Sequence, residues 1–180
     1  MREFVALEVG DPGDPQGREG SPRPPAHLTL RFLGEVAEYR EEPIAAALAS
    51  AAAATATFDF TLEGVGAFPS RNSARVVWVG VTAGREEVVE LSGRVSEALA
   101  RIGFPPEPHE FVPHVTLFRV RSRVERRRAR ELLEGSVPAP GPRTVHVTEL
   151  FLKESSLTPQ GPVHRTRGNF PLRGGPASVG

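Results

Sequence analysis

A tetrapeptide built on histidine, threonine and leucine occurs twice in this chain. It reads HLTL from His27 to Leu30 and HVTL from His114 to Leu117, each time within a run that is typical of a strand. Side chains two positions apart share one face of a strand, so histidine and threonine point one way while the apolar residues point into a core. Because internal repetition indicates repeated architecture, we expect the chain to build the same strand twice.

Another histidine and threonine pair has the same spacing in a different setting. His146 and Thr148 are followed by Glu149 instead of leucine, and no proline precedes them. We interpret this pair as ordinary strand residues. The matched copies at His27 and His114 are interpreted as functional.

The residues around both copies are similar to those of a known family. The first copy continues as HLTLRFLGEV over 27–36, and the second belongs to FVPHVTLFR over 111–119. Between them lie GAFPS at 66–70 and RVVWVGV at 75–81. Through these segments the chain, from 4 to 172, resembles the 2H phosphoesterase superfamily and, within it, the branch called 2′-5′ RNA ligase or RNA 2′,3′-cyclic phosphodiesterase.

The resemblance implies an α+β fold in one bilobed domain over residues 1–172. Two pseudo-symmetric antiparallel sheets would carry helices on their outer faces and enclose a central cleft, and residues 173–180 would form a disordered tail. Family members usually have a helix before the first motif. Here Gly10 to Ala26 contains nine glycines and prolines among seventeen residues, so we predict a long loop instead.

Hydrophobic periodicity and turn residues place the remaining elements. Helical spacing of apolar residues is clearest from Val88 to Ile102, whereas alternation dominates the strands. We predict helices at 43–54, 85–102 and 124–134, and strands at 2–9, 26–33, 57–65, 74–81, 113–120, 144–153 and 163–170.

Composition excludes several classes of function. The 180 residues contain no cysteine, which excludes disulfides, thiolate nucleophiles and cysteine-bound zinc. With 22 basic and 22 acidic residues the net charge is zero, so a nonspecific grip on long nucleic acid is not expected, and recognition of one phosphate at an RNA end fits better. No secretory signal or apolar span is evident, and a cytoplasmic monomer without a membrane partner is expected.

Phosphodiester chemistry at the two histidines is what the resemblance implies. Opening a 2′,3′-cyclic phosphate to a 2′-phosphate requires a base that takes a proton from water and an acid that protonates the departing sugar oxygen, and imidazole can serve as either near neutral pH. By resemblance His27 is the acid and His114 the base. Thr29 and Thr116 would donate hydrogen bonds to the phosphoryl oxygens. This scheme needs no metal and no other cofactor.

Three more residues are candidates for substrate binding. Plain strand alternation puts Arg31 on the face of His27, as a phosphate clamp, and Phe118 on the face of His114, as a surface on which a base could stack. Arg119 is the basic residue that the family carries at this position, although alternation turns it away from the cleft. Phe68 and Trp78 are expected to be packing residues.

Several alternatives remain open at this stage. The substrate could be an RNA 3′ end, a small cyclic-phosphate nucleotide or a 2′-5′ oligonucleotide, and the same site could catalyse 2′-5′ ligation. A noncatalytic module that binds RNA ends is the alternative from another class. His109 and His164 could add metal ligands, but no metal-binding spacing is evident. The seven arginines within 119–130 are either the exposed side of a helix, which we favour, or a patch that follows RNA.

Overall fold

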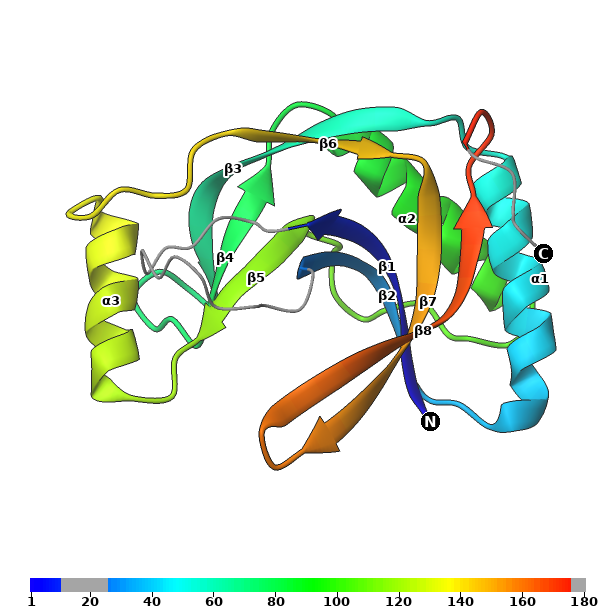
Figure 1. Cartoon of the computed structure of the whole chain (residues 1–180), viewed down its shortest axis with the longest axis horizontal. Coiled ribbons are helices and arrows are strands. Elements are labelled where there is room, and N and C mark those ends of the chain that lie inside the picture. The colour runs from blue at the N-terminus through cyan, green and yellow to red at the C-terminus, as the bar shows by residue number, and fades with distance from the viewer. Residues whose placement is uncertain (11–25, 176–180) are drawn as a thin grey trace.

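Two four-stranded antiparallel sheets form the framework (Figure 1). The structure is a computed structural model that describes residues 1–10 and 26–175. The first sheet has the order β2-β1-β7-β8, with β1 (Arg2–Gly10), β2 (Ala26–Glu35), β7 (Glu149–Thr158) and β8 (Gly161–Pro171). The second has the order β5-β4-β3-β6, with β3 (Phe58–Phe68), β4 (Val76–Val81), β5 (His114–Arg119) and β6 (Arg143–Val147). The predicted α+β fold with two antiparallel sheets is confirmed.

One predicted strand is wrong. The segment 144–153, predicted as continuous, divides at Thr148 into β6 of the second sheet and β7 of the first. The alternation changes phase at the division, since Val145 and Val147 are buried before it and Leu150 and Leu152 after it. The three-residue spacing between Val147 and Leu150 was the sequence signal for the crossing from one sheet to the other, and the prediction of one continuous strand passed over it.

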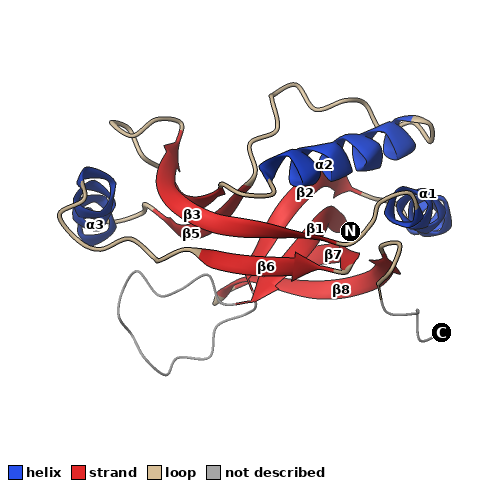
Figure 2. Cartoon of the chain, turned by 90° about the horizontal axis from the view of Figure 1, so that it is seen from above, coloured by secondary structure: helices blue, strands red, loops and turns tan. Residues whose placement is uncertain are grey.

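Three α-helices and one short 3-10 helix cover the sheets (Figure 2). The 3-10 helix (Glu38–Arg40) leads into α1 (Glu41–Ala53), which packs against α2 (Arg85–Ala100) and β8. Helix α2 contacts both β2 and β3, and so links the two sheets. It buries Val88, Leu91, Val95 and Leu99, each of which contributes about 2 kcal/mol through removal of apolar surface from water.

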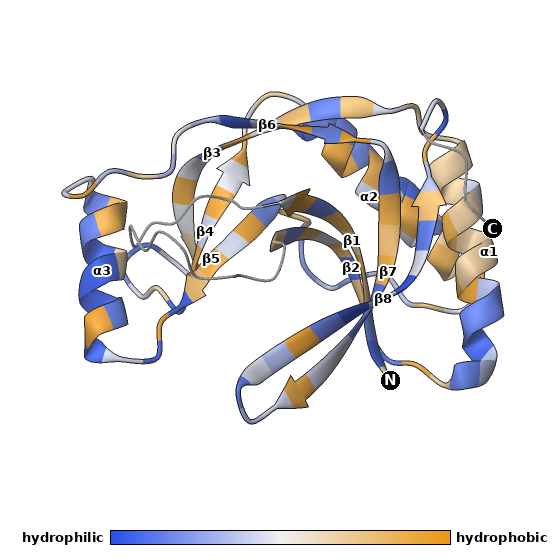
Figure 3. Ribbon diagram, in the orientation of Figure 1, coloured by the Kyte–Doolittle hydropathy of each residue, from blue (hydrophilic) through white to orange (hydrophobic). Residues whose placement is uncertain are grey.

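Helix α3 (Arg123–Glu134) lies apart from the other two, beside the second sheet. It begins with a capping box, in which the Ser122 hydroxyl accepts from the backbone N–H of Glu125 and the Glu125 carboxylate accepts from the N–H of Ser122. Only Ala129 and Leu132 are buried, in a small core with Val77. Figure 3 shows that the rest of the helix is largely hydrophilic.

The apolar positions of both motifs lie in the main core, as predicted. Leu28 and Val115 are fully buried, and Leu30 is nearly so. Leu117 is half-buried between the main core and the small core under α3. The histidines and threonines consequently lie on the other face of their strands, which we call the histidine face of each sheet.

The chain ends are described in part. The backbone of Arg173 accepts from Thr57 and donates to Thr55, so the start of the tail predicted to be disordered is paired. Residues 176–180 of that tail, and 11–25 of the predicted loop, lie outside the described residues. Within the described part, no helix is both long and apolar enough to cross a lipid bilayer.

Candidate active site

The two motif strands are the edge strands of their sheets and lie side by side. β2 ends the order of the first sheet, β5 ends that of the second, and the two strands contact each other. A pocket of about 850 Å³ lies where β2, α2 and the segment before β5 meet, and its lining includes Thr29 of the first motif and His114 of the second but neither His27 nor Thr116. The structure therefore brings both motifs, 87 residues apart, to one site.

His27 is packed among aromatic rings of the first sheet. Its ring centroid lies 4.9 Å from that of Phe4 and 5.0 Å, edge to face, from that of His164. Burial lowers the pKa of His27 from 6.5 to about 4, and the positive charges of His164 and Lys153 contribute to this shift. The His27 imidazole is therefore neutral at pH 7.

His114 has a different environment, built from the second sheet. Its Nδ1 lies 2.7 Å from the carbonyl oxygen of Val112, so the neutral ring donates from Nδ1 and keeps the lone pair on Nε2. Phe68 approaches edge-on at 4.8 Å between centroids, and Trp78 lies at 5.9 Å. Burial lowers the pKa of His114, while the hydrogen bond to Val112 offsets part of that effect.

Phe68 and Trp78 pack, as expected, and one ring that they pack against is His114. Both rings lie on the histidine face and contact His114. Trp78 lies across Gly66 of the neighbouring strand, where a Cβ would come within 2.3 Å of the indole. Glycine at this position lets the indole lie close to the sheet beside the imidazole.

Both motif strands carry a β-bulge directly after their threonine. In β2, Thr29 pairs with Ala6 of β1, whereas Arg31, two residues further along β2, pairs with Val5, which is adjacent to Ala6. The residue of β2 between Thr29 and Arg31 therefore has no partner. In β5, Thr116 pairs with Trp78 but Phe118 pairs with Val77. A bulge inserts one residue without a partner and reverses the faces of the residues that follow it, up to the next irregularity.

The bulge in β2 overturns the prediction for Arg31. Arg31 pairs with the core residue Val5 and is 5% exposed, away from the histidine face. Its guanidinium donates to the carbonyl of Pro105 and lies 3.5 Å from the Glu107 carboxylate. Arg31 borders the pocket, and its guanidinium holds the segment around Pro105.

The bulge in β5 has the opposite consequence for the pair that follows it. Phe118 is turned into the small core with Val77 and α3, so the prediction that it faces the cleft is wrong. Arg119 pairs with Val76, which lies on the same face of β4 as Trp78. The exposed Arg119 therefore shares the histidine face with His114, which plain alternation did not allow.

The sequence surrounding these strands identifies the family. The pattern of the 2′-5′ RNA ligase superfamily matches residues 9–156. The chain belongs to this superfamily. The resemblance inferred from the two motifs is therefore confirmed, and it extends well beyond them.

Curated relatives and solved structures agree with this assignment to the 2′-5′ RNA ligase superfamily. RNA 2′,3′-cyclic phosphodiesterase of Aeropyrum pernix is 40% identical over 144 residues, 78% of each chain. The protein of that name from Thermotoga maritima is 31% identical over 97% of each chain. A crystal structure of a Thermus thermophilus protein has a TM-score of 0.74 at 26% identity over 96% of this chain and 98% of its own. E. coli LigT complexed with 3′-AMP shares the fold, with a TM-score of 0.70 at 24% identity and the same coverage.

Two residues near His27, namely His164 and Lys153, were not assigned to the site from the sequence. From the sequence, His164 was considered only as a metal ligand. His164, on β8, pairs with Ser155 of β7, and its ring contacts that of His27. Lys153 is 8% exposed, and its ammonium lies 2.5 Å from the Glu8 carboxylate. Lys153 also donates to the Thr166 hydroxyl at 3.2 Å. A signal was present, because His164 and Thr166 repeat the motif spacing.

The other two histidines have distinct positions. His146 is exposed on β6 and lies 2.5 Å from an Asp59 carboxylate oxygen, consistent with an ordinary strand residue. His109 lines the pocket from the segment that precedes β5. Among residues 1–10 and 26–175, no three histidine, aspartate or glutamate side chains converge as metal ligands would.

Proposed function

We propose that this protein hydrolyses RNA-terminal 2′,3′-cyclic phosphate to a 2′-phosphate by acid/base catalysis at two histidines, without a metal ion. The observation that carries the proposal is the arrival of both motifs at one pocket from edge strands of two different sheets. Two imidazoles that approach one phosphorus from different sides supply the base and the acid that the reaction needs. The activity named for the Aeropyrum and Thermotoga relatives supports the same chemistry.

His114 is proposed as the base. Its Nδ1–H donates to Val112, so the lone pair on Nε2 is directed away from the backbone and is available for a proton from water. The water oxygen forms a bond to phosphorus as its proton passes to His114. The bond from phosphorus to the 3′-oxygen then breaks, and the phosphate stays on the 2′-oxygen.

His27 is proposed as the acid that protonates the departing 3′-oxygen. Its pKa of about 4 in the protein alone is too low for this task at pH 7. The substrate phosphate carries a negative charge, and an opposite charge within a few ångströms raises the pKa of a histidine. Substrate binding would therefore protonate His27 only when there is a phosphate for it to act on.

The remaining charge on the phosphoryl oxygens would be stabilised by donors on both histidine faces. Thr29 and Thr116 lie two residues after the histidines and can donate their hydroxyl protons. Arg119, exposed on the same face as His114, replaces Arg31 as the phosphate ligand in our proposal. The pocket of about 850 Å³ beside His114 has the size that a nucleoside requires.

A substrate panel tests the proposal. Turnover would be compared on RNA with a 2′,3′-cyclic phosphate end, on cyclic mononucleotides and on 2′-5′ oligonucleotides, each with and without excess chelator. We expect hydrolysis of the cyclic phosphate end to a 2′-phosphate at an unchanged rate in chelator. Absence of turnover on the whole panel, with RNA-end binding retained, would favour a noncatalytic binding module, and loss in chelator restored by one divalent ion would contradict the metal-free scheme.

A further inference from the structure

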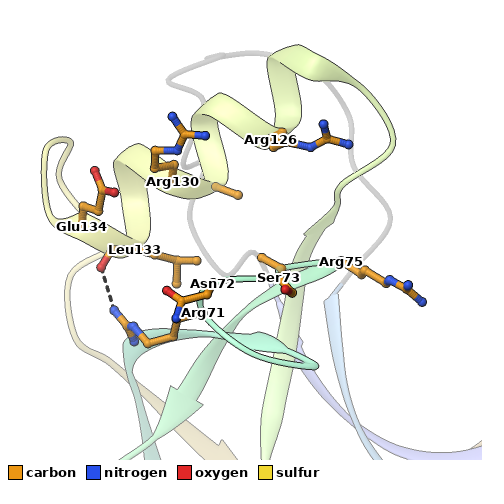
Figure 4. A pocket seen from close by; sticks show the side chains of 10 residues that line it. Arg71, Asn72, Ser73, Arg75, Arg126, Arg130, Leu133 and Glu134 are labelled. Carbon is orange, nitrogen blue, oxygen red and sulfur yellow. Dashed lines mark hydrogen bonds between the residues drawn. The ribbon is translucent and has the colours of Figure 1, made fainter.

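A groove lined by arginines lies between α3 and the turn that joins β3 to β4 (Figure 4). Its volume is about 620 Å³, and four of the residues that line it are Arg71, Arg75, Arg126 and Arg130. The chain as a whole has no net charge. The groove, which we call the arginine groove, is therefore a local concentration of positive charge, which attracts anions.

The geometry of α3 divides its arginines into two groups. Arg126 and Arg130 are four residues apart, lie on one flank of the helix and line the groove. Arg127 is on another side, where its side chain is 74% exposed and its guanidinium lies 3.9 Å from Glu131. Arg126 and Arg130 are exposed as well, so the interpretation as an exposed helix side holds for all three arginines, and the first two differ only in that they border the groove.

The four arginines of the groove have different roles. Arg71 donates to the carbonyl oxygens of Val65 and Leu133, and so fastens the turn to the end of α3. Within the described parts of the chain, Arg75, Arg126 and Arg130 form no ion pair. The carboxylate of Glu134 is at the Leu133 end of the groove (Figure 4). Three guanidiniums are thus available to an anionic ligand.

The backbone connects this groove to the active site. Arg75 donates its N–H to the carbonyl of Phe68, whose ring contacts His114, and its carbonyl accepts from Val120 at the end of β5. Six residues of extended strand separate His114 from Val120, a distance of roughly 20 Å. Because Val77 packs against α3, the groove lies toward the face of the second sheet opposite His114. A mononucleotide at His114 is too small to reach the groove, whereas a longer strand that passes Arg119 and rounds the end of the edge strand β5 can enter it.

We propose that the arginine groove binds phosphodiester groups of the RNA strand several nucleotides upstream of the reacting 3′ end. This inference rests on the proposed function and specifies its substrate as single-stranded RNA in preference to a free cyclic nucleotide. Arginine is suited to the task because its planar guanidinium donates two parallel hydrogen bonds to phosphate. Contacts of this kind position a strand without reading its sequence.

A pair of double variants provides the test. Arg126→Gln/Arg130→Gln removes two charges from the groove, and Arg123→Gln/Arg127→Gln removes two charges from the same helix outside the groove. The substrates are a single-stranded RNA of about ten nucleotides with a 2′,3′-cyclic phosphate end and cytidine 2′,3′-cyclic phosphate.

We expect the groove variant to lose about tenfold in kcat/KM on the RNA and nothing on the cytidine substrate, because only the RNA spans the two sites. The slope of log kcat/KM against log salt should become shallower by about 1.4, since two phosphate contacts to a single strand are lost. The matched control should keep both the rate on RNA and the salt slope. Equal losses in the two double variants would show that the effect depends on the net charge of the protein and not on the groove, and would overturn the inference.

A binding measurement separates this inference from the proposed function. Fluorescence anisotropy with the same RNA ending in an unreactive 3′ hydroxyl needs no turnover. Weaker binding by the groove variant alone supports the groove even if no substrate is hydrolysed. Unchanged RNA binding, or a groove that binds polyglutamate instead of RNA, contradicts it.

Discussion

The two halves of the site use one strand design to present different chemistry. In each half an edge strand carries histidine and threonine on one face and then a β-bulge. The fourth residue after each histidine, Arg31 or Phe118, is turned away, and the fifth, Phe32 or Arg119, shares the histidine face. Arginine precedes phenylalanine in the first half and follows it in the second. The first half therefore presents an aromatic ring on its histidine face, and the second half presents a positive charge.

The environments of the two imidazoles also differ between the halves. His27 lies beside two other bases, His164 and Lys153, which oppose its protonation. His114 has a carbonyl partner at Nδ1 that favours protonation and fixes the tautomer. A repeated motif therefore fixes the position of a functional group, while the neighbouring strands determine its pKa and its role.

The largest expected effect comes from removing either histidine. His27→Ala and His114→Ala should each lower kcat about 100- to 10,000-fold, the usual contribution of general acid/base catalysis. A cyclic substrate with a good leaving group needs no acid, so it should restore much of the rate to His27→Ala and little to His114→Ala. Rescue of the His114 variant instead would reverse the assigned roles, and failure of both would indicate that the histidines mainly bind phosphate.

Substitutions of Arg119 and Arg31 provide the next test. Arg119→Gln should lower kcat/KM about 10- to 100-fold, because a charged hydrogen bond to phosphate is lost, with little change in the free energy of unfolding. Arg31→Gln should instead destabilise the fold by about 1 to 3 kcal/mol, because the Pro105 carbonyl and Glu107 lose their buried partner. Urea unfolding and steady-state kinetics on both variants would show whether the two effects separate; equal kinetic losses without destabilisation would contradict the roles assigned from the bulges.

The pH dependence of stability should differ between the halves. With a folded pKa of about 4 against an ordinary value of 6.5, His27 binds fewer protons when folded, so its contribution is complete above pH 6.5 and is lost as pH falls toward 4. After allowance for its partial exposure this contribution is about 1 to 2 kcal/mol. His27→Gln should flatten the stability profile in this window more than His114→Gln does, because the Val112 hydrogen bond limits the shift at His114. Identical profiles for the two variants would show that the halves do not differ.

The smallest effect is expected at His164. His164→Phe keeps a ring against His27 and removes a competing positive charge, so the pKa of His27 should rise toward its usual value. Nuclear magnetic resonance titration of the His27 ring would measure the change, with the exposed His146→Phe as control. A lower pKa in the His164 variant would show that the second imidazole stabilises the charged ring instead of opposing it.

Much of the fold could be predicted because it depends on local pattern. The strands, the common face of histidine and threonine in each motif and the burial of Leu28 and Val115 follow from alternation and repetition, whereas the arrangement in two sheets was implied by the family resemblance. The bulges could not be predicted, because an extra residue in one strand is defined only by its pairing with another. Plain alternation therefore assigns the residues directly beyond each bulge, Arg31 and Phe118 among them, to the wrong face.

The contact between His27 and His164 was missed for a related reason. These residues are on β2 and β8, at opposite ends of the sheet order, and only the twist of the sheet and the size of the rings bring them together. Sequence separation and strand order both suggest distance. Repetition of the motif spacing at His164 was the only local indication.

Trp78 gives the second half of the site an optical signal of its own. It is the only tryptophan in the chain, and its indole lies 5.9 Å from His114 across the surface that Gly66 leaves open. The fluorescence excited at the red edge of indole absorption therefore comes from one known place. This fluorescence should respond to the charge and occupancy of the second motif. The first motif, which has phenylalanine and histidine around it, contributes no emission at this excitation wavelength.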